Sequence, residues 1–167
     1  GRSSGVKDDM WAFTSRNPAL DLRAATTFAA ASRALKGYND DLAKRALEQS
    51  KRLLKEATEL LGKQPQDTSV WRRSANVGTN LQLYIATGDK QYRDKFEELL
   101  WPALDRSVVF LLLTALDAIP HMDASYKEKL RPYVAKYNDY IKRLEKENPY
   151  GVPITLGNWA GSGMVMN

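Results

Sequence analysis

The chain has 167 residues, 43% of them hydrophobic, with a formal net charge of +5 and no cysteine. This length and composition predict one domain with a buried core, and the lack of cysteine excludes disulfides and thiolate chemistry. The longest apolar run, 107–118, is shorter than the roughly 18 residues of a membrane-spanning helix. The chain contains no run of lysine and arginine interleaved with aromatic residues, so nucleic-acid binding is not predicted.

The first two predicted helices differ in how their apolar residues are distributed. One begins at Asn17, an N-cap residue followed by proline, and runs through an Ala-, Thr- and Leu-rich sequence to Gly37. The next is expected to be capped by Asp40 and to end before Gly62, and about half of its residues are charged. Its apolar residues lie on one stripe, as in a helix with a single buried face.

The same alternation continues along the chain. A helix over 70–86 carries few charges after Arg73, and the turn 87–89 leads into a charged helix over 91–100. Proline is tolerated in the first turn of a helix but not in its middle. Pro102 is therefore predicted to lie at the start of a new helix.

The last predicted helices repeat the apolar-then-charged order. The helix over 103–119 is the most apolar segment of the chain, and Pro120 ends it. Asp123 is expected to cap a charged helix that is kinked at Pro132. After a long loop, 159–167 is predicted to begin a further helix.

Apolar and amphipathic helices therefore alternate. A helix that is apolar all round must be covered on all sides, whereas a helix with one apolar stripe lies at the surface. Two layers satisfy both patterns. Counted along the chain, the first, third and fifth predicted helices lie inside, and the second, fourth and sixth lie outside. We expect an all-α fold of alternating inner and outer helical hairpins, a toroid or solenoid, rather than a four-helix bundle, whose helices would carry comparable stripes.

All four tryptophans fall where a charged segment or a long loop gives way to an apolar helix. An indole ring offers a broad, rigid apolar face, which suits the apolar face of a pyranose ring. The other reading is that these rings pack between helices, and it is strongest for Trp101, which lies in the shortest connection. If successive helices are antiparallel, all four tryptophans lie at one rim of the array, and the long connections lie at the same rim. The four are Trp11, Trp71, Trp101 and Trp159.

Three stretches of the chain carry motifs of a known enzyme family. Residues 148–163 contain N-P-Y-G-V-P-I and G-N-W-A-G-S-G, 24–34 read A-A-T-T-F-A-A-A-S-R-A, and 83–92 read L-Y-I-A-T-G-D-K-Q-Y. These stretches resemble the catalytic domain of glycoside hydrolase family 9, with its P-Y-G-x-P loop, alanine-rich inner helix and L-Y-x-A-T-G-D-x-x-Y turn. The last motif is common among helical-hairpin glycosidases, so the order of all three carries the resemblance. It covers nearly the whole chain from about Phe13.

The resemblance implies part of an (α/α)6 barrel that hydrolyses β-linked glucans or related plant polysaccharides with inversion. It also implies a cellulase-like enzyme that is secreted or periplasmic and uses no cofactor or metal, although residues 1–10 lack the apolar segment of a secretory signal. The family's general base, in a D-A-G-D motif, and its late glutamate acid have no counterpart here. Residues 1–167 are therefore expected to form one segment, about half of the catalytic domain, with the remaining part of that domain as a partner.

The residues expected to contact an oligo- or polysaccharide lie at the rim of long loops. Many relatives carry a large aromatic residue where this chain has Gly78, and a tryptophan two turns earlier is expected to replace it. An arginine beside that tryptophan can donate hydrogen bonds to ring hydroxyls or to an acidic group. The predicted substrate-binding residues are Trp71, Arg72, Tyr150, Trp159 and Trp11.

Inverting hydrolysis requires two carboxyl groups roughly 6.5–9.5 Å apart, and no pair in this chain is assigned that role. Asp21 and Asp105 are expected in first turns of helices, where a carboxylate favours the helix dipole. His121 is the single histidine and is expected in a tight turn, so no metal cluster is predicted. The other acids expected at the rim of long loops are Asp8, Asp9, Asp67 and Glu147.

Two other functions compete with this reading. A non-catalytic helical-repeat module would bind peptide in a concave groove of charged or amide side chains, whereas the expected inner helices offer mainly Ala, Leu, Val and Thr. Another α/α-toroid enzyme would use Arg72 and Arg73 to bind the carboxylates of a uronic-acid polysaccharide.

Overall fold

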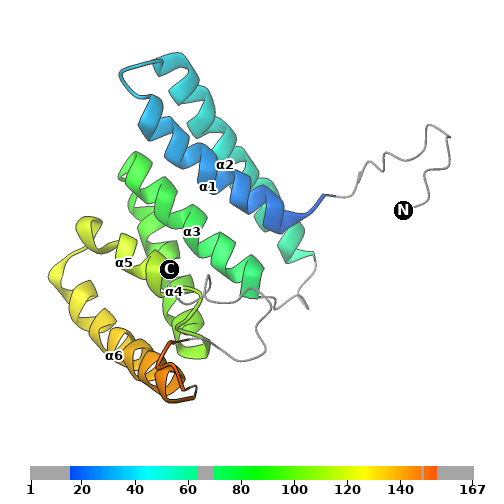
Figure 1. Ribbon diagram of the computed structural model, residues 1–167. Coiled ribbons are helices and arrows are strands. Elements are labelled where there is room, and N and C mark those ends of the chain that lie inside the picture. The colour runs from blue at the N-terminus through cyan, green and yellow to red at the C-terminus, as the bar shows by residue number, and fades with distance from the viewer. Residues whose placement is uncertain (1–15, 64–69, 148, 154–167) are drawn as a thin grey trace, which may run out of the picture.

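The computed structural model describes residues 16–63, 70–147 and 149–153, and this part of the chain is built of helices without a strand (Figure 1). The all-α prediction is therefore confirmed. None of the described helices is both long and apolar enough to cross a membrane. The elements, in chain order, are α1 (Pro18–Leu35), α2 (Asp40–Gly62), α3 (Val70–Thr87), α4 (Lys90–Arg106), α5 (Leu112–Asp117), a 3-10 turn (Ile119–His121) and α6 (Ala124–Glu147).

Side-chain caps fix the starts of the first two helices. Asn17 caps α1 as predicted, because its Oδ1 accepts a hydrogen bond of 3.0 Å from a backbone N–H of the first turn. The cap of α2 is Asn39 rather than Asp40, since Asn39 Oδ1 accepts from the N–H of Leu42 at 3.0 Å. Asp40 instead accepts from the N–H of Gly37 at 2.8 Å. Gly37 has a φ of 86°, a conformation that favours glycine.

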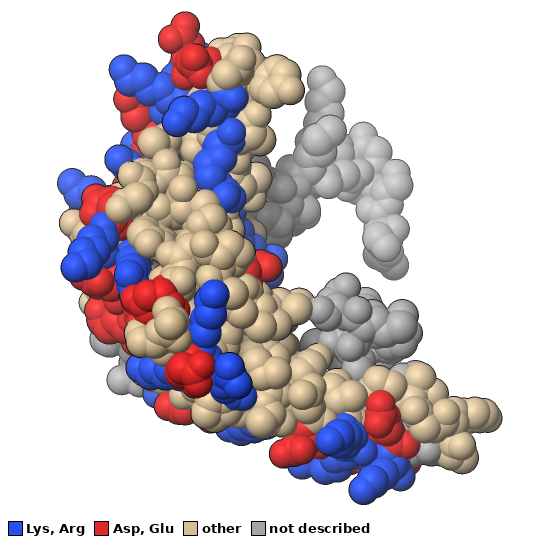
Figure 2. Space-filling model, turned by 90° about the vertical axis from the view of Figure 1, so that its left-hand side faces the viewer, with Lys and Arg blue, Asp and Glu red and all other residues tan. Residues whose placement is uncertain are grey.

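The helices form two layers. α1 and α3 lie side by side, α2 packs on α1, and α4 packs on α3 (Figure 1). Figure 2 shows many of the charged side chains along the convex edge of a curved molecule, on the side of α2 and α4. The hollowed side opposite is the side of α1 and α3. The amphipathic helices thus present their charged faces outward.

Small residues let α1 approach both of its neighbours closely. Ala25 and Ala29 of α1 are fully buried. Toward α2, the Ser50 hydroxyl donates to the Ala25 carbonyl at 2.7 Å. Toward α3, the hydroxyls of Thr26 and Thr79 are 2.9 Å apart. Hydrogen bonds of buried and half-buried hydroxyls therefore join the three helices in addition to apolar contact.

One flank of α1 is left uncovered by the described helices, as expected for the first inner helix of half a ring. Leu20 is 61% exposed and Phe28 is 37% exposed. With Ala24 and Ala31 they recur at helical spacing, so they share one face. Among the described elements, α1 packs chiefly on α2 and α3, which leaves this flank open. We call the stripe of Leu20, Ala24, Phe28 and Ala31 the open flank.

The predicted helix boundary at Pro102 is wrong. α4 continues through Pro102, and the chain bends only after it, before a six-residue α5. The predicted single helix over 103–119 therefore does not form. The physical reason is a continuous buried face, because Phe96, Leu100 and Leu104 recur at four-residue spacing with no exposed surface. Burial of these side chains, each worth about 1.5–3 kcal/mol, carries the helix past the proline.

A cluster of buried apolar residues joins α3, α4, α5 and α6. Each helix contributes side chains from one face, as amphipathic helices do. The cluster includes Val77, Leu81, Phe96, Leu100, Leu104, Leu112, Ala115, Tyr126 and Leu130.

Asp123 connects the start of α6 to α4. Its Oδ1 accepts hydrogen bonds from the N–H of Tyr126 at 3.1 Å, as predicted for a cap, and from the Ser125 hydroxyl at 2.6 Å. Its Oδ2 lies 2.5 Å from Nη2 of Arg93. The hydrogen bond from Ser125 and the Arg93 guanidinium lower the pKa of Asp123 below its ordinary range.

We expect Asp123 to make the stability of the fold depend on pH. Because the pKa of Asp123 is lower in the folded chain, its stabilising effect is complete above the ordinary value of 3.8 and is lost as the pH falls through the folded value. Asp123→Asn keeps a capping side chain but removes the charge. Melting curves at a series of pH values should show wild type losing more stability in acid than Asp123→Asn, and equal losses would contradict this role.

Candidate functional site

The ends of several helices meet at one rim. Figure 1 places the starts of α1 and α3 at the same end of the array as the last turns of α2 and α4, toward the lower right. This follows from the antiparallel succession of helices that the sequence predicted. We call this end the loop rim, and its described residues are 16–18, 61–63, 70–73, 104–107, 145–147 and 149–153.

The five predicted sugar-contacting residues are only partly placed. Trp71 and Arg72 lie in the first turn of α3, and their side chains lie outside what the structure describes. Tyr150 follows α6 and is 87% exposed. Trp11 and Trp159 lie outside the described residues. Contacts among the five are therefore not established, and their common site stays a prediction.

Trp101 is a packing residue rather than a rim residue. It lies inside α4 and is only 9% exposed. Its ring centroid is 5.2 Å from that of Tyr126 and 5.9 Å from that of Tyr133, both on α6. The Lys129 ammonium lies 4.3 Å from the indole centroid, within cation–π range. The reading of Trp101 as an interhelical packing residue therefore describes it correctly.

The acids predicted near helix starts have structural partners. Asp21 lies in the first turn of α1, as predicted, and its carboxylate is 2.9 Å from Arg16. Asp105 lies in the last turn of α4 instead of a first turn, because α4 does not end at the proline. Its carboxylate accepts a hydrogen bond of 2.8 Å from Tyr133. Glu147 is the last residue of α6, and Asp8, Asp9 and Asp67 lie outside the described residues.

His121 is exposed and lies in the 3-10 turn after α5, as predicted for a turn residue. Its backbone carbonyl accepts a hydrogen bond of 3.1 Å from the Tyr84 hydroxyl, which ties the turn to α3. Over residues 16–63, 70–147 and 149–153, no cluster of three His, Asp or Glu side chains is arranged to hold a metal ion.

A cavity of about 380 Å³ lies at the loop rim, between the end of α4 and the second half of α6. The Arg143 guanidinium lies 5.3 Å from the Tyr140 ring centroid. Lys136 Nζ donates to the Asp105 carbonyl at 3.3 Å. Three cationic side chains and one acid line the cavity, so it suits a carboxylate or another anionic group. We call it the basic pocket, with the lining residues Arg106, Lys136, Asp139, Tyr140 and Arg143.

A larger cavity, of about 1010 Å³, lies between α2 and α4 and exposes part of α3 at its floor. It arises because α2 and α4 each pack on an inner helix and leave a space between themselves. Its volume matches the upper end of the range for ligand pockets, about 300–1,000 Å³. We call it the outer groove, with the lining residues Lys51, Leu54, Asn76, Asn80, Tyr92 and Lys95.

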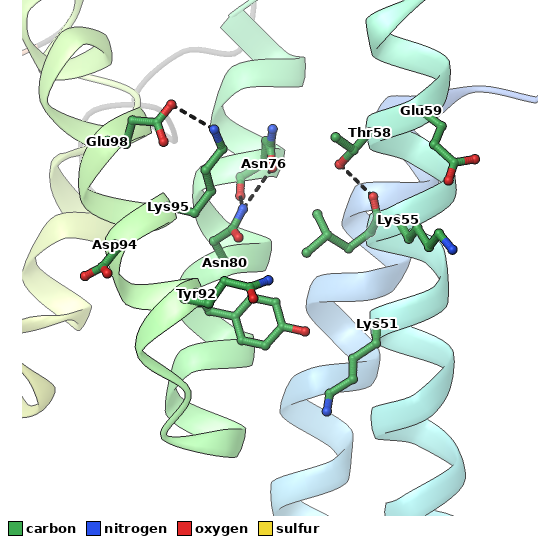
Figure 3. Close-up of a pocket in the computed structure, with 12 residues that line it drawn as sticks. Lys51, Lys55, Thr58, Glu59, Asn76, Asn80, Tyr92, Asp94, Lys95 and Glu98 are labelled. Atoms are coloured by element: carbon green, nitrogen blue, oxygen red, sulfur yellow. Dashed lines mark hydrogen bonds and ion pairs between the residues drawn. The ribbon is translucent and has the colours of Figure 1, made fainter.

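The floor of the outer groove carries two amides in contact. Figure 3 shows Asn76 and Asn80 close together on α3, with the Tyr92 ring extending toward α2. Asn80 Nδ2 donates to the Asn76 carbonyl at 2.8 Å and to Asn76 Oδ1 at 2.9 Å. At the edge of the groove, Lys95 Nζ lies 2.8 Å from a Glu98 carboxylate oxygen. Polar groups are thus fixed in place at the floor of a wide cavity.

Sequence reasoning missed both cavities. The signal for the outer groove was the pair Asn76 and Asn80, one turn apart on a helix with no charged residue after Arg73, where buried polar side chains need partners. The signal for the basic pocket was the recurrence of Lys136 and Arg143 on one face of α6. The second wall of the basic pocket comes from the end of α4 and the bend after it, whose course was predicted incorrectly. The second wall of the outer groove comes from residues 91–98 of α4, which were predicted as helix, and what the sequence did not show is how α2 and α4 are placed.

No family model matches the chain, and neither the curated proteins nor the solved structures gave a match. The resemblance to glycoside hydrolase family 9 therefore depends on the sequence motifs alone.

Proposed function

We propose that this chain is a sugar-binding segment of a secreted or periplasmic glycoside hydrolase similar to family 9. In this proposal it forms part of an (α/α)6 barrel and contributes subsites for a β-linked glucan. Hydrolysis proceeds with inversion, and the two catalytic carboxyl groups come from the remaining part of the parent domain.

The observation that carries the proposal is that the helices form an inner and an outer layer, and that both inner helices begin at the loop rim. α1 and α3 are neighbouring inner helices, each with an outer partner, and both begin at the loop rim. The first residues of an inner helix therefore lie at the rim end of the inner layer. In α3 these residues include Trp71 and Arg72. Binding residues commonly occupy such positions, at the loops of a rigid scaffold.

Two further features support the proposal. The open flank of α1 leaves Leu20 and Phe28 exposed, and such an apolar stripe fits the side of another inner helix. The remaining part of the parent domain would supply that helix. At Gly78, an added Cβ would meet no other atom within 4 Å, so there is open space beside α3 at this position.

The basic pocket favours a second candidate, an α/α-toroid enzyme acting on uronic-acid polysaccharides. Arg106, Lys136 and Arg143 surround a cavity at the same rim, with Tyr140 beside them. Guanidinium groups bind carboxylates with paired hydrogen bonds. In this candidate a uronate carboxylate occupies the basic pocket, and the neighbouring sugar ring contacts Tyr140.

We expect cellohexaose to shift the tryptophan fluorescence of the chain, because indole rings at the loop rim become covered. Trp71→Ala and Trp159→Ala should each weaken binding by about tenfold, which corresponds to about 1.4 kcal/mol for a lost aromatic contact. Titrations read by fluorescence, with calorimetry as a second readout, measure both. Trp101 is buried, so its emission should stay constant.

Two exposed tyrosines provide a matched control. Tyr150, 87% exposed, lies at the loop rim, and Tyr38, 91% exposed, lies at the opposite rim. Tyr150→Ala should weaken cellohexaose binding, whereas Tyr38→Ala should leave it unchanged. A response to oligogalacturonate that is lost in Arg143→Ala, with no response to cellohexaose, would favour the second candidate. No response to either sugar would refute both.

A further inference from the structure

Asn80 is a buried polar side chain with one atom left to bind. The residue is only 2% exposed, and both of the hydrogen bonds described for its side chain use Nδ2. Its Oδ1 has no hydrogen-bond partner among the described residues, yet the residue lines the outer groove. Because Oδ1 is not one of the buried atoms that lack a partner, solvent reaches it from the groove, and it can accept a hydrogen bond from a molecule bound there.

The neighbouring polar groups complement that acceptor. Asn76 uses its Oδ1 to hold Asn80, so its Nδ2 is left as a donor on the same floor. Tyr92 adds a hydroxyl, and burial together with Asp89 raises the pKa of that phenol, which keeps it protonated. A ligand that binds this floor must therefore both donate and accept hydrogen bonds through groups that lie close together. Neighbouring hydroxyl groups do both.

The charges around the outer groove favour a neutral ligand. Lys95 is paired with Glu98 at 2.8 Å. Figure 3 shows Lys55 and Asp94 pointing away from the floor, while Lys51 extends from α2 into the gap below Tyr92. Three lysines and three acids line the groove altogether. This balance gives a strongly charged ligand little electrostatic preference, and one lysine can donate to a hydroxyl as well as to an anion.

We propose that the outer groove is a second carbohydrate site, separate from the loop rim, that takes a neutral oligosaccharide chain. The sugar class follows from the proposed function, whereas the site follows from the groove and its amide floor. One sugar ring lies over Asn76, Asn80 and Tyr92, with Lys51 donating to a hydroxyl. A volume of about 1010 Å³ leaves room for further rings along the groove. Such a site would hold a polysaccharide chain on the outer face of the domain.

The experiment follows the side-chain amide signals of Asn76 and Asn80 by NMR while cellohexaose is added to the full chain. Both signals should shift with a common affinity. Lys51→Met and Asn76→Ala should each weaken that affinity about fivefold, as expected for one hydrogen bond worth about 1 kcal/mol. Lys44→Met is the matched control, because Lys44 is an exposed lysine two turns earlier on α2 and does not line the groove. It should change the affinity less than twofold.

Further outcomes separate this site from the loop rim. Trp71→Ala and Trp159→Ala should leave the amide shifts unchanged, and Lys51→Met should leave the tryptophan fluorescence response unchanged. A fluorescence response without amide shifts would overturn the second site and keep the proposed function. Amide shifts without a fluorescence response would support the groove and count against the loop rim. Amide shifts caused by an acidic oligosaccharide or a neutral peptide, with none from cellohexaose, would overturn the assignment of the ligand.

Discussion

Trp101→Ala is expected to lower the free energy of unfolding by about 3–5 kcal/mol, as for other large aromatic side chains removed from a core. The indole packs between Tyr126 and Tyr133, at centroid distances of 5.2 and 5.9 Å, and joins α4 to α6. Truncation leaves a cavity that these rings can fill only in part. Urea unfolding followed by circular dichroism measures the loss.

Tyr150→Ala is the control, because Tyr150 is 87% exposed and its removal should change stability by no more than about 0.5 kcal/mol. Trp101→Phe gives a second comparison. The indole Nε1 is buried and has no hydrogen-bond partner among the described residues, and an unpaired buried donor costs about 1–3 kcal/mol. Phenylalanine removes that donor, so Trp101→Phe should lose much less stability than Trp101→Ala. A Trp101→Ala variant that stays stable but loses sugar binding would contradict the packing role.

The helices that could be predicted from sequence are those with strong local signals. Asn17 followed by proline, and Asp123 before an amphipathic run, each marked a helix start that the structure confirms. Gly37 marked the end of α1 because its φ of 86° disfavours other residues. Such signals act within one turn of the chain, so they need no knowledge of the partners that pack on the helix.

The errors arose where tertiary packing outweighed local preference. The rule that proline belongs in the first turn is local, whereas α4 is held by Leu100 and Leu104, which are buried against other helices. The outer groove depends on the gap between α2 and α4, which is a property of helix placement. The predicted sugar-binding residues mark the ends of elements, and their mutual distances cannot be derived from spacing in the chain.

Pro102→Ala is expected to raise the free energy of unfolding by about 2 kcal/mol. Proline inside a helix costs about 3 kcal/mol relative to alanine, because it lacks an N–H and clashes with the preceding turn. About 0.4–1 kcal/mol of this is offset, since proline also restricts the unfolded chain. Pro102 is exposed, so its replacement removes little packing. The substitution also restores a backbone N–H at this position, which can donate to the Glu98 carbonyl one turn earlier.

The sign of the stability change in Pro102→Ala tests whether α4 continues through this residue. If Pro102 began a separate helix, its fixed φ would favour that start, and alanine would be neutral or destabilising. In the continuous α4 the same substitution stabilises and raises the helical circular dichroism signal near 222 nm, the usual helix band. Pro132→Ala should behave similarly, because Pro132 is also exposed and lies inside α6. Stabilisation by Pro132→Ala but not by Pro102→Ala would mean that α4 breaks at the proline. The buried face of Phe96, Leu100 and Leu104 would then be too weak to carry the helix through it.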